Sequence, residues 1–320
     1  MPDKEYDNLS IIAEIARMYY EKNIPQNEIA NRMFFSKSKV SRILNKAKEL
    51  GIVEIKINYP IERIYSLENE IKQLFNLNEV IIIRNYPEHN NGDIRLERLG
   101  KCAADYIDSK LVDGDKVGLS WGRTLGYTIR QLKPKEKKDI SVIQMMGAPA
   151  DNYDDQLNSM NLVRTMSELY GGKNLFLYAP LFVENNLVKK SLMKEKIIIK
   201  TLNEAKNVDY LITGIADFSL GANSWAGYLD EQRVNELRKR GVVGFICGHL
   251  IDKNGRGTFG EEEDNIIGVS LQDIKSIPNV IAVAGGLDKV KAILAALNGG
   301  YINCLITDEF IGEKLIQLKK

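Results

Sequence analysis

The 320-residue chain has few cysteines and histidines, and their scarcity excludes several kinds of site. Its three cysteines, Cys102, Cys247 and Cys304, are far apart in apolar surroundings, which predicts buried thiols and no disulfide framework or zinc motif. Of the two histidines, His89 lies in a polar segment. His249 lies in an apolar run, where a histidine with satisfied hydrogen bonds is more common than a metal ligand. We therefore expect no metal site.

Long apolar runs and nucleotide-binding loops are also missing. No run of 18 apolar residues and no signal peptide occurs, so we expect a soluble, cytoplasmic protein without a membrane partner. There is no Walker motif and no dinucleotide-type glycine spacing, so we expect no cofactor. With 44% hydrophobic residues, 27% charged residues and a net charge of +1, the composition is typical of a globular protein of two or three domains.

Charge of one sign is nevertheless concentrated near the N-terminus. From Arg32 to Lys48 there are six basic residues and no acidic one. Between Ser36, a candidate N-cap, and Gly51, a candidate helix stop, apolar residues recur at helical spacing. They are Val40, Ile43, Leu44, Ala47 and Leu50. The other face carries hydroxyl, amide and basic side chains, the types that bind phosphates and base edges.

Two further helical segments, "LSIIAEIARMYYEKNI" and "QNEIANRM", precede this basic helix, and "FFS" predicts a tight turn before it. We therefore predict a helix-turn-helix domain over residues 1–58 that binds double-stranded operator DNA in the major groove. An ordinary solvated basic helix would not explain the cap, the turn and the side-chain chemistry together. The extended "IVEIKINYP" predicts a short β-wing or strand after the helices. The predicted DNA-binding residues are Gln26, Ser36, Lys37, Ser38, Lys39, Ser41, Arg42 and Asn45.

The rest of the chain predicts a linker and an α/β domain. Apolar residues at helical spacing in "IERIYSLENEIKQLFNL" predict a linker helix within residues 59–78, which is a connector, a dimerising helix or the first helix of the next domain. From 79 to 320, short apolar runs such as "EVIIIRNY", "DKVGLSW" and "VVGFICGHL" alternate with helical segments. This predicts a doubly wound, Rossmann-like parallel sheet that binds ligands at the carboxyl ends of its strands.

Three glycine-containing loops follow predicted strands and are suited to an anion. "SWGRT" combines hydroxyl groups with a glycine at a helix start, and "LITGI" ends another strand. "AGGLDK" places Lys289 in the first turn of a helix, where its charge opposes the helix dipole unless an anion is bound. Together the loops predict a phosphorylated small ligand. The predicted binding residues are Ser120, Gly122, Arg123, Thr124, Thr213, Gly214, Gly285, Gly286 and Lys289.

These segments resemble the SorC-type bacterial transcription regulators. "ARMYYEKNIPQNEIANRMFFSKSKVSRILNKAKELGIVEIKI" resembles the DNA-binding segment of that family, with Pro25 in place of the usual serine or threonine cap. "VGLSWGRTL", "YAPLFV" and "VAGGLDKVKAILAALNGG" resemble blocks of its effector domain, so the resemblance covers nearly the whole chain. It implies a fold of the phosphosugar isomerase and deaminase type, a sugar or sugar-phosphate effector, and a homodimer or homotetramer. Phe245 stands where many members carry an acid that can hold sugar hydroxyls.

The leading hypothesis is therefore a DNA-binding transcription regulator, not an enzyme, controlled by a sugar or sugar phosphate. The alternative is an isomerase- or deaminase-like enzyme of phosphosugars with an accessory DNA-binding module. Such an enzyme needs a positioned general acid and base. Asp217 and Asp252 are candidates, but the sequence gives neither a recognisable partner, and we predict no catalytic residue.

Overall fold

The computed structural model describes residues 3–54, 61–86, 92–149, 158–218, 229–257, 260 and 264–319. The chain divides into two compact units, Met1–Pro60 and Ile61–Lys320, each with its own hydrophobic core. We call them the N-terminal and the C-terminal unit. No helix in the described ranges is both long enough and apolar enough to span a membrane.

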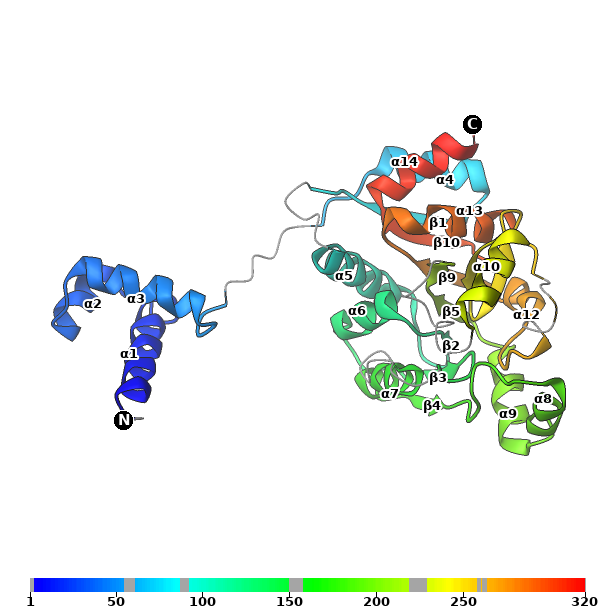
Figure 1. The fold of residues 1–320 in the computed structure, drawn as a ribbon, viewed down its shortest axis with the longest axis horizontal. Helices are drawn as coiled ribbons and strands as arrows, with labels where there is room; N and C mark the ends of the chain where they lie inside the picture. Colours follow the sequence, from blue (N-terminus) through cyan, green and yellow to red (C-terminus); the bar gives the residue numbers. More distant parts are fainter. Residues whose placement is uncertain are drawn as a thin grey trace. The chain divides into compact units, whose positions relative to one another are not determined.

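The N-terminal unit consists of α1 (Asp3–Tyr20), α2 (Gln26–Met33) and α3 (Lys37–Glu49), in blue in Figure 1. As predicted, α3 begins after Ser36, whose hydroxyl accepts a hydrogen bond of 3.2 Å from the Lys39 N–H. Phe34 takes a left-handed conformation (φ 52°) and turns the chain between α2 and α3. The buried residues of the three helices form the core: Ile12, Ile15, Ala16, Ile29, Ala30, Val40, Leu44 and Ala47. The predicted helical region is thus confirmed, whereas most of the predicted wing, residues 55–60, lies outside the described residues.

The C-terminal unit is built on a seven-stranded parallel sheet, which confirms the predicted α/β fold. Apart from the exposed edge strand β4 (Lys173–Leu175), its strands are largely apolar and almost entirely buried, because helices cover the sheet. In spatial order they are β1 (Glu79–Ile83), β10 (Cys304–Asp308), β9 (Asn279–Val283), β5 (Tyr210–Thr213), β2 (Lys116–Leu119), β3 (Ser141–Gln144) and β4 (Lys173–Leu175).

Helices lie on both sides of this sheet. In Figure 1, α5 (Gly92–Lys110), α6 (Arg123–Gln131) and α7 (Ser159–Tyr170) lie on one side, and α10 (Glu231–Lys239), α12 (Leu271–Ser276) and α13 (Val290–Asn298) on the other. The remaining helices are α4 (Tyr65–Phe75), α8 (Asn186–Leu192), α9 (Lys196–Ala205) and α14 (Glu309–Lys319).

The strand order reverses next to β2. From β2 the chain moves outward through β3 to the edge strand β4, and then returns to place β5 on the other side of β2. The loops after β2 and β5 therefore leave in different directions and open a crevice at the carboxyl ends of these strands. Ligands of open α/β sheets bind at such a reversal point.

A small antiparallel sheet follows the carboxyl end of β5. It consists of β6 (Ile215–Asp217), β7 (Val242–Ile246) and β8 (His249–Asp252). The run "VVGFICGHL", expected to supply a strand of the parallel sheet, instead forms the β7–β8 hairpin, so that expectation was wrong. The turn residues Cys247 and Gly248 both have positive φ (47° and 82°), which suits a two-residue hairpin loop.

Helix α4 is joined to β1 through the buried carboxylate of Glu68. Nε and Nη2 of Arg63 each donate to the Glu68 carboxylate at 2.9 Å, and that carboxylate also accepts from the Ile82 N–H at 2.9 Å. Ile64 N–H donates to the carbonyl of Ile82, so the segment before α4 runs beside the end of β1. This linker helix therefore packs within the C-terminal unit, with Ile71 in its core.

The three cysteines are buried free thiols, as expected. Burial is the largest cause that raises their pKa values, to about 11 for Cys102 and about 12 for Cys247 and Cys304. All three are protonated at neutral pH.

Candidate functional site

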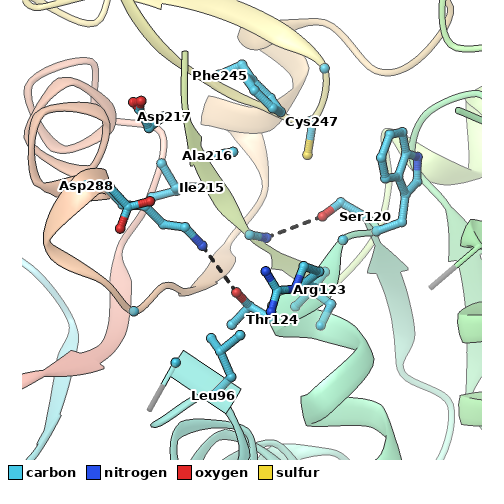
Figure 2. A pocket seen from close by; sticks show the side chains of 18 of the residues that line it. Leu96, Ser120, Arg123, Thr124, Ile215, Ala216, Asp217, Phe245, Cys247 and Asp288 are labelled. Atoms are coloured by element: carbon cyan, nitrogen blue, oxygen red, sulfur yellow. Dashed lines mark hydrogen bonds between the residues drawn. The ribbon is translucent and has the colours of Figure 1, made fainter. Parts of the chain in front are cut away.

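A cavity of about 210 Å³ lies at the reversal point of the sheet, and the three predicted loops meet there. Figure 2 shows side chains from these loops facing one another across it. Most of the predicted ligand-binding residues line the cavity: Ser120, Gly122, Arg123, Thr124, Gly214, Gly285 and Lys289. The other two, Thr213 and Gly286, are the direct neighbours of lining residues. The loops meet because β2, β5 and β9 are parallel, so their carboxyl ends lie at one edge.

The loops after β2 and β5 are joined by hydroxyl groups. The buried Ser120 hydroxyl donates to Thr213 Oγ1 at 3.1 Å and accepts from the Gly214 N–H at 3.4 Å. Thr213 Oγ1 in turn lies 3.0 Å from the Gly214 carbonyl oxygen and 3.4 Å from Cys247 Sγ. The Ser120 proton is thus already used inside the protein, and Thr213 supports the cavity wall from behind.

The start of α6 faces the cavity without a side-chain cap. Gly122 precedes the helix with φ 130°, a conformation that only glycine adopts readily, and its carbonyl accepts from the Gly126 N–H at 2.9 Å. The backbone N–H groups of Arg123, Thr124 and Leu125 come before this bond and have no partner within the helix. A helix start of this kind carries partial positive charge and binds anions.

Lys289 approaches the same point from the other side. It ends the short helix η3 (Leu287–Lys289), which follows Gly286 in a positive-φ conformation (108°). The half-buried ammonium donates to Thr124 Oγ1 at 3.4 Å, a bond drawn in Figure 2. Burial is the largest cause that lowers the pKa of Lys289; Arg123 and Arg95 lower it further, while Asp288 opposes the shift. Asp288 and Asp308 thus offset the burial penalty of this half-buried ammonium only in part, and the two neighbouring arginines add to it.

The other walls of the cavity are acidic and apolar. Asp217 and Asp288 lie on the side opposite Ser120 in Figure 2, and their carboxylates can accept hydrogen bonds from ligand hydroxyls. Phe245 lines the cavity as a buried apolar wall next to Cys247. The remaining apolar lining comes from Leu96, Trp121, Leu125, Met146, Ile215 and Ala216.

The sequence did not predict that α5 contributes to the cavity, although Arg95 and Leu96 line it. The sequence of α5 is typical of an amphipathic helix, and Arg95 resembles one of its solvent-exposed charged residues. Asp288 was missed as well, although it belongs to the quoted "AGGLDK" loop.

His249 and Asp252, considered above as a metal ligand and as a catalytic acid or base, both have partners within the protein. His249 Nε2 lies 2.6 Å from the Val269 carbonyl oxygen in the core, as expected for a satisfied histidine. Asp252 binds Arg256 at 3.0 Å and accepts two backbone N–H bonds in the turn after β8, away from the cavity lining. Within the described residues no group of three or more metal-ligating side chains could hold a metal ion.

The second candidate surface is the polar face of α3. Of the predicted DNA-binding residues, Gln26 and Ser41 are half-buried. The others are exposed: Ser36, Lys37, Ser38, Lys39, Arg42 and Asn45. Arg42 Nε donates to the Ser38 carbonyl at 3.4 Å, and Lys39 Nζ lies 3.7 Å from the centre of the Phe35 ring. Among the described residues no ion pair neutralises the cations of α3, so this face keeps its positive charge.

Comparison with known proteins extends over both units. Residues 59–317 match the family described as "Putative sugar-binding domain". The chain is 30% identical to the deoxyribonucleoside regulator of Bacillus subtilis (strain 168), over 98% of this chain and 99% of that protein. It is 26% identical to the sorbitol operon regulator of Klebsiella pneumoniae, over 97% of this chain and 99% of that one.

Solved structures give the same result. The full-length sorbitol operon regulator SorC from Klebsiella pneumoniae superposes with a TM-score of 0.74 at 26% identity, covering 96% of this chain and 98% of that one. A transcriptional regulator from Streptococcus pneumoniae TIGR4 gives a TM-score of 0.75 at 29% identity, covering 79% and 97% of the two chains. These relatives are transcription regulators and not enzymes. The chain therefore belongs to the SorC/DeoR family of sugar-responsive transcriptional regulators.

Proposed function

We propose that this regulator binds operator DNA through α2 and α3, and that a sugar phosphate in the cavity of the C-terminal unit controls this binding. The positive face of α3 supports the first part. Its serine, asparagine and arginine side chains can bond phosphates and base edges, and no acid of the same helix turn opposes them. The proposed DNA contacts are those predicted from the sequence, led by Arg42 and Lys37.

The single observation that carries the second part is the pair formed by Lys289 and the start of α6. A half-buried ammonium with one hydroxyl partner faces the N-terminal N–H groups of a helix. Both carry positive charge, and burying such groups without an anion is costly. A phosphate bound between Lys289, Thr124 and the N–H groups after Gly122 would satisfy all of them.

The remaining walls support a sugar as the rest of the ligand. Asp217 and Asp288 can accept from hydroxyl groups, and the apolar lining can cover the carbon skeleton. The names of the relatives agree with a ligand related to sugars, because one is a sorbitol operon regulator and another a deoxyribonucleoside regulator. Phe245 in place of an acid implies fewer polar contacts to the sugar on that side.

Specific DNA binding also requires more than one copy of the chain. One helix-turn-helix motif contacts only a few base pairs, so we propose at least a homodimer on a palindromic operator. The resemblance to the SorC family further implies a homotetramer on DNA. Because its proposed partner is operator DNA, we place the protein in the cytoplasm.

A thermal-shift screen tests the effector class. Pentose and hexose phosphates and the corresponding free sugars are added to the full chain, and a true effector at a hundred times its dissociation constant stabilises it by about 2.7 kcal/mol. The stabilising compound is then added to gel-shift titrations with operator DNA selected from random duplexes. Failure of every phosphorylated compound to stabilise the protein would contradict the proposal.

A further inference from the structure

Arg95 is a cavity residue without an adequate partner. It extends from the first turn of α5, lines the cavity, and its side chain is only 23% exposed. Its Nε is buried and, within the described residues, has no hydrogen-bond partner. A guanidinium has five N–H donors, and leaving them unpaired away from water costs free energy.

The nearest acid does not supply the missing bonds. Asp308 Oδ2 lies 4.0 Å from Arg95 Nε, beyond hydrogen-bond distance. This buried carboxylate already accepts from the Gly286 N–H at 3.0 Å, the Ile311 N–H at 3.1 Å and Asn85 Nδ2 at 3.3 Å. Its oxygens therefore hold the turn after β9 in place, while Arg95 forms an ion pair with Asp308 but no hydrogen bond.

Arg95 lies close to the other cations of the site. Its Nη2 atom is 3.4 Å, and Asp288 Oδ1 2.5 Å, from the point where a side chain at Gly286 would begin, so the guanidinium lies against the turn that presents Asp288 and Lys289. Arg123 also lines the cavity, but it forms an ion pair of 3.0 Å with Asp93. Arg95 and Lys289 are thus two cavity cations whose hydrogen-bonding capacity is largely unused.

We propose that Arg95 is a specificity-determining residue that binds the phosphate of the effector together with Lys289, so that the cavity selects a dianionic phosphate monoester over singly charged and neutral ligands. The inference rests on the proposed function and names its ligand class more narrowly. The planar guanidinium matches phosphate oxygens through two parallel hydrogen bonds. Two cations match the two negative charges that a phosphate monoester carries above its second pKa of about 6.

The test compares two small probes that differ by one charge. Methyl phosphate is a dianion at pH 7.5, whereas dimethyl phosphate has one charge only. Because Trp121 lines the cavity, tryptophan fluorescence of the full chain follows both titrations. The proteins are the wild type, Arg95→Gln, Arg95→Lys, Lys289→Ala and the control Lys101→Gln, which removes a charge from an exposed position of the same helix.

We expect the wild type and Lys101→Gln to prefer methyl phosphate strongly. Arg95→Gln should bind methyl phosphate about 10- to 100-fold more weakly, the value of one charged hydrogen-bonded contact, and should lose most of its preference over dimethyl phosphate. Arg95→Lys should recover part of the affinity and part of the preference, because lysine restores the charge but not the two parallel hydrogen bonds of the guanidinium. Thermal unfolding of each variant identifies any that fails to fold.

Other outcomes are informative in different ways. If Lys289→Ala abolishes methyl phosphate binding while Arg95→Gln and Arg95→Lys keep wild-type affinity and preference, the inference is overturned and the proposed function stands. If Arg95→Gln weakens both probes equally, Arg95 does not select charge, and the inference is again overturned. If methyl phosphate does not bind the wild type or binds all variants alike, the phosphate site of the proposed function falls as well.

Discussion

The Lys289 ammonium lies 3.4 Å from the Thr124 hydroxyl, and this bond connects the turn after β9 to the first turn of α6 across the cavity. Thr124 belongs to α6 and Lys289 to η3, and the two residues are far apart in the sequence. The pairing is long for a charged hydrogen bond, which prefers about 2.7–2.9 Å. A small anion between the two groups would replace one poor bond by several good ones.

Replacing Lys289 should make the unliganded protein more stable and abolish its binding of the effector. In Lys289→Met no charge has to be desolvated, so we expect the unliganded protein to melt at a higher temperature, by about 2–4 °C for each kcal/mol relieved. The same variant should lose stabilisation by the effector and keep its operator affinity without effector, because the DNA-binding unit has its own core. Differential scanning fluorimetry and gel shifts measure both. A variant that still responds at the wild-type effector concentration would exclude Lys289 as the anchor.

Effector affinity should rise and then fall as pH increases, which gives its pH profile an acidic and an alkaline limb. Binding should strengthen as pH rises through about 6, where the phosphate gains its second charge. It should weaken again as pH rises through the pKa of Lys289, which burial holds below its ordinary value despite Asp288 and Asp308, so the loss begins at lower pH than for an exposed lysine. Titration calorimetry between pH 5.5 and pH 10 measures both limbs. In Lys289→Met the alkaline limb should disappear; its persistence there would contradict the assignment.

Lys289 should also make the stability of the unliganded protein depend on pH. The direction of this dependence follows from the difference between its pKa values in the folded and unfolded states. Its pKa in the folded protein is lowered, so the unfolded chain binds more protons between the folded pKa and the ordinary value. The burial penalty is therefore fully present below the folded pKa, and stability should rise with pH through that window. Chemical unfolding of wild type and Lys289→Met across alkaline pH should show this rise in the difference between the two proteins.

Two substitutions in α3 should weaken DNA binding in different ways. Arg42→Ala should cost about 1–3 kcal/mol and relax the preference at one base position. Lys37→Ala should weaken binding to all sequences and reduce the salt dependence by about one phosphate contact. The matched control is Arg17→Ala, because Arg17 lies on α1 in an exposed pair with Glu14. Titrations with the selected operator at several salt concentrations distinguish the cases; equal affinity of Arg42→Ala and wild type would contradict the assignment of α3.

The assembly should be visible without DNA. We expect light scattering at micromolar concentration to give at least twice the mass of the 36.2 kDa chain, and a homotetramer on a palindromic operator. A monomeric mass with operator DNA present would contradict this.

The ion pair between Arg63 and Glu68 should stabilise the C-terminal unit strongly. Arg63→Ala leaves the buried Glu68 carboxylate with the Ile82 N–H as its main partner, and should cost about 2–4 kcal/mol. The control Lys173→Ala breaks a pair with Asp139 in which both side chains are well exposed, and should cost less than about 1 kcal/mol. Urea unfolding of both variants gives the difference. Equal losses would show that burial does not set the strength of these pairs.

The sequence predicts the loops that form the site better than it predicts which charged side chains line the cavity. The turn at Gly122 and the lysine after Gly286 are recognisable because glycine and a misplaced cation are local signals. Three parallel strands then bring them together. Arg95 gives no such signal, since it reaches the cavity only through the packing of α5, and an arginine in a charged helix looks solvated. The β7–β8 hairpin was misread for a similar reason, because its turn has Cys247 in place of the usual asparagine or glycine.

The buried thiols make the chain well suited to distance measurements. Maleimides react with thiolates, and Cys102, Cys247 and Cys304 have pKa values of about 11, 12 and 12, so none competes with a surface cysteine at neutral pH. Glu49→Cys at the end of α3 and Lys101→Cys on α5, both at exposed positions, would put one label on each unit with every native cysteine retained. Spectroscopy on such a pair can follow how far apart the two units lie as ligand is added.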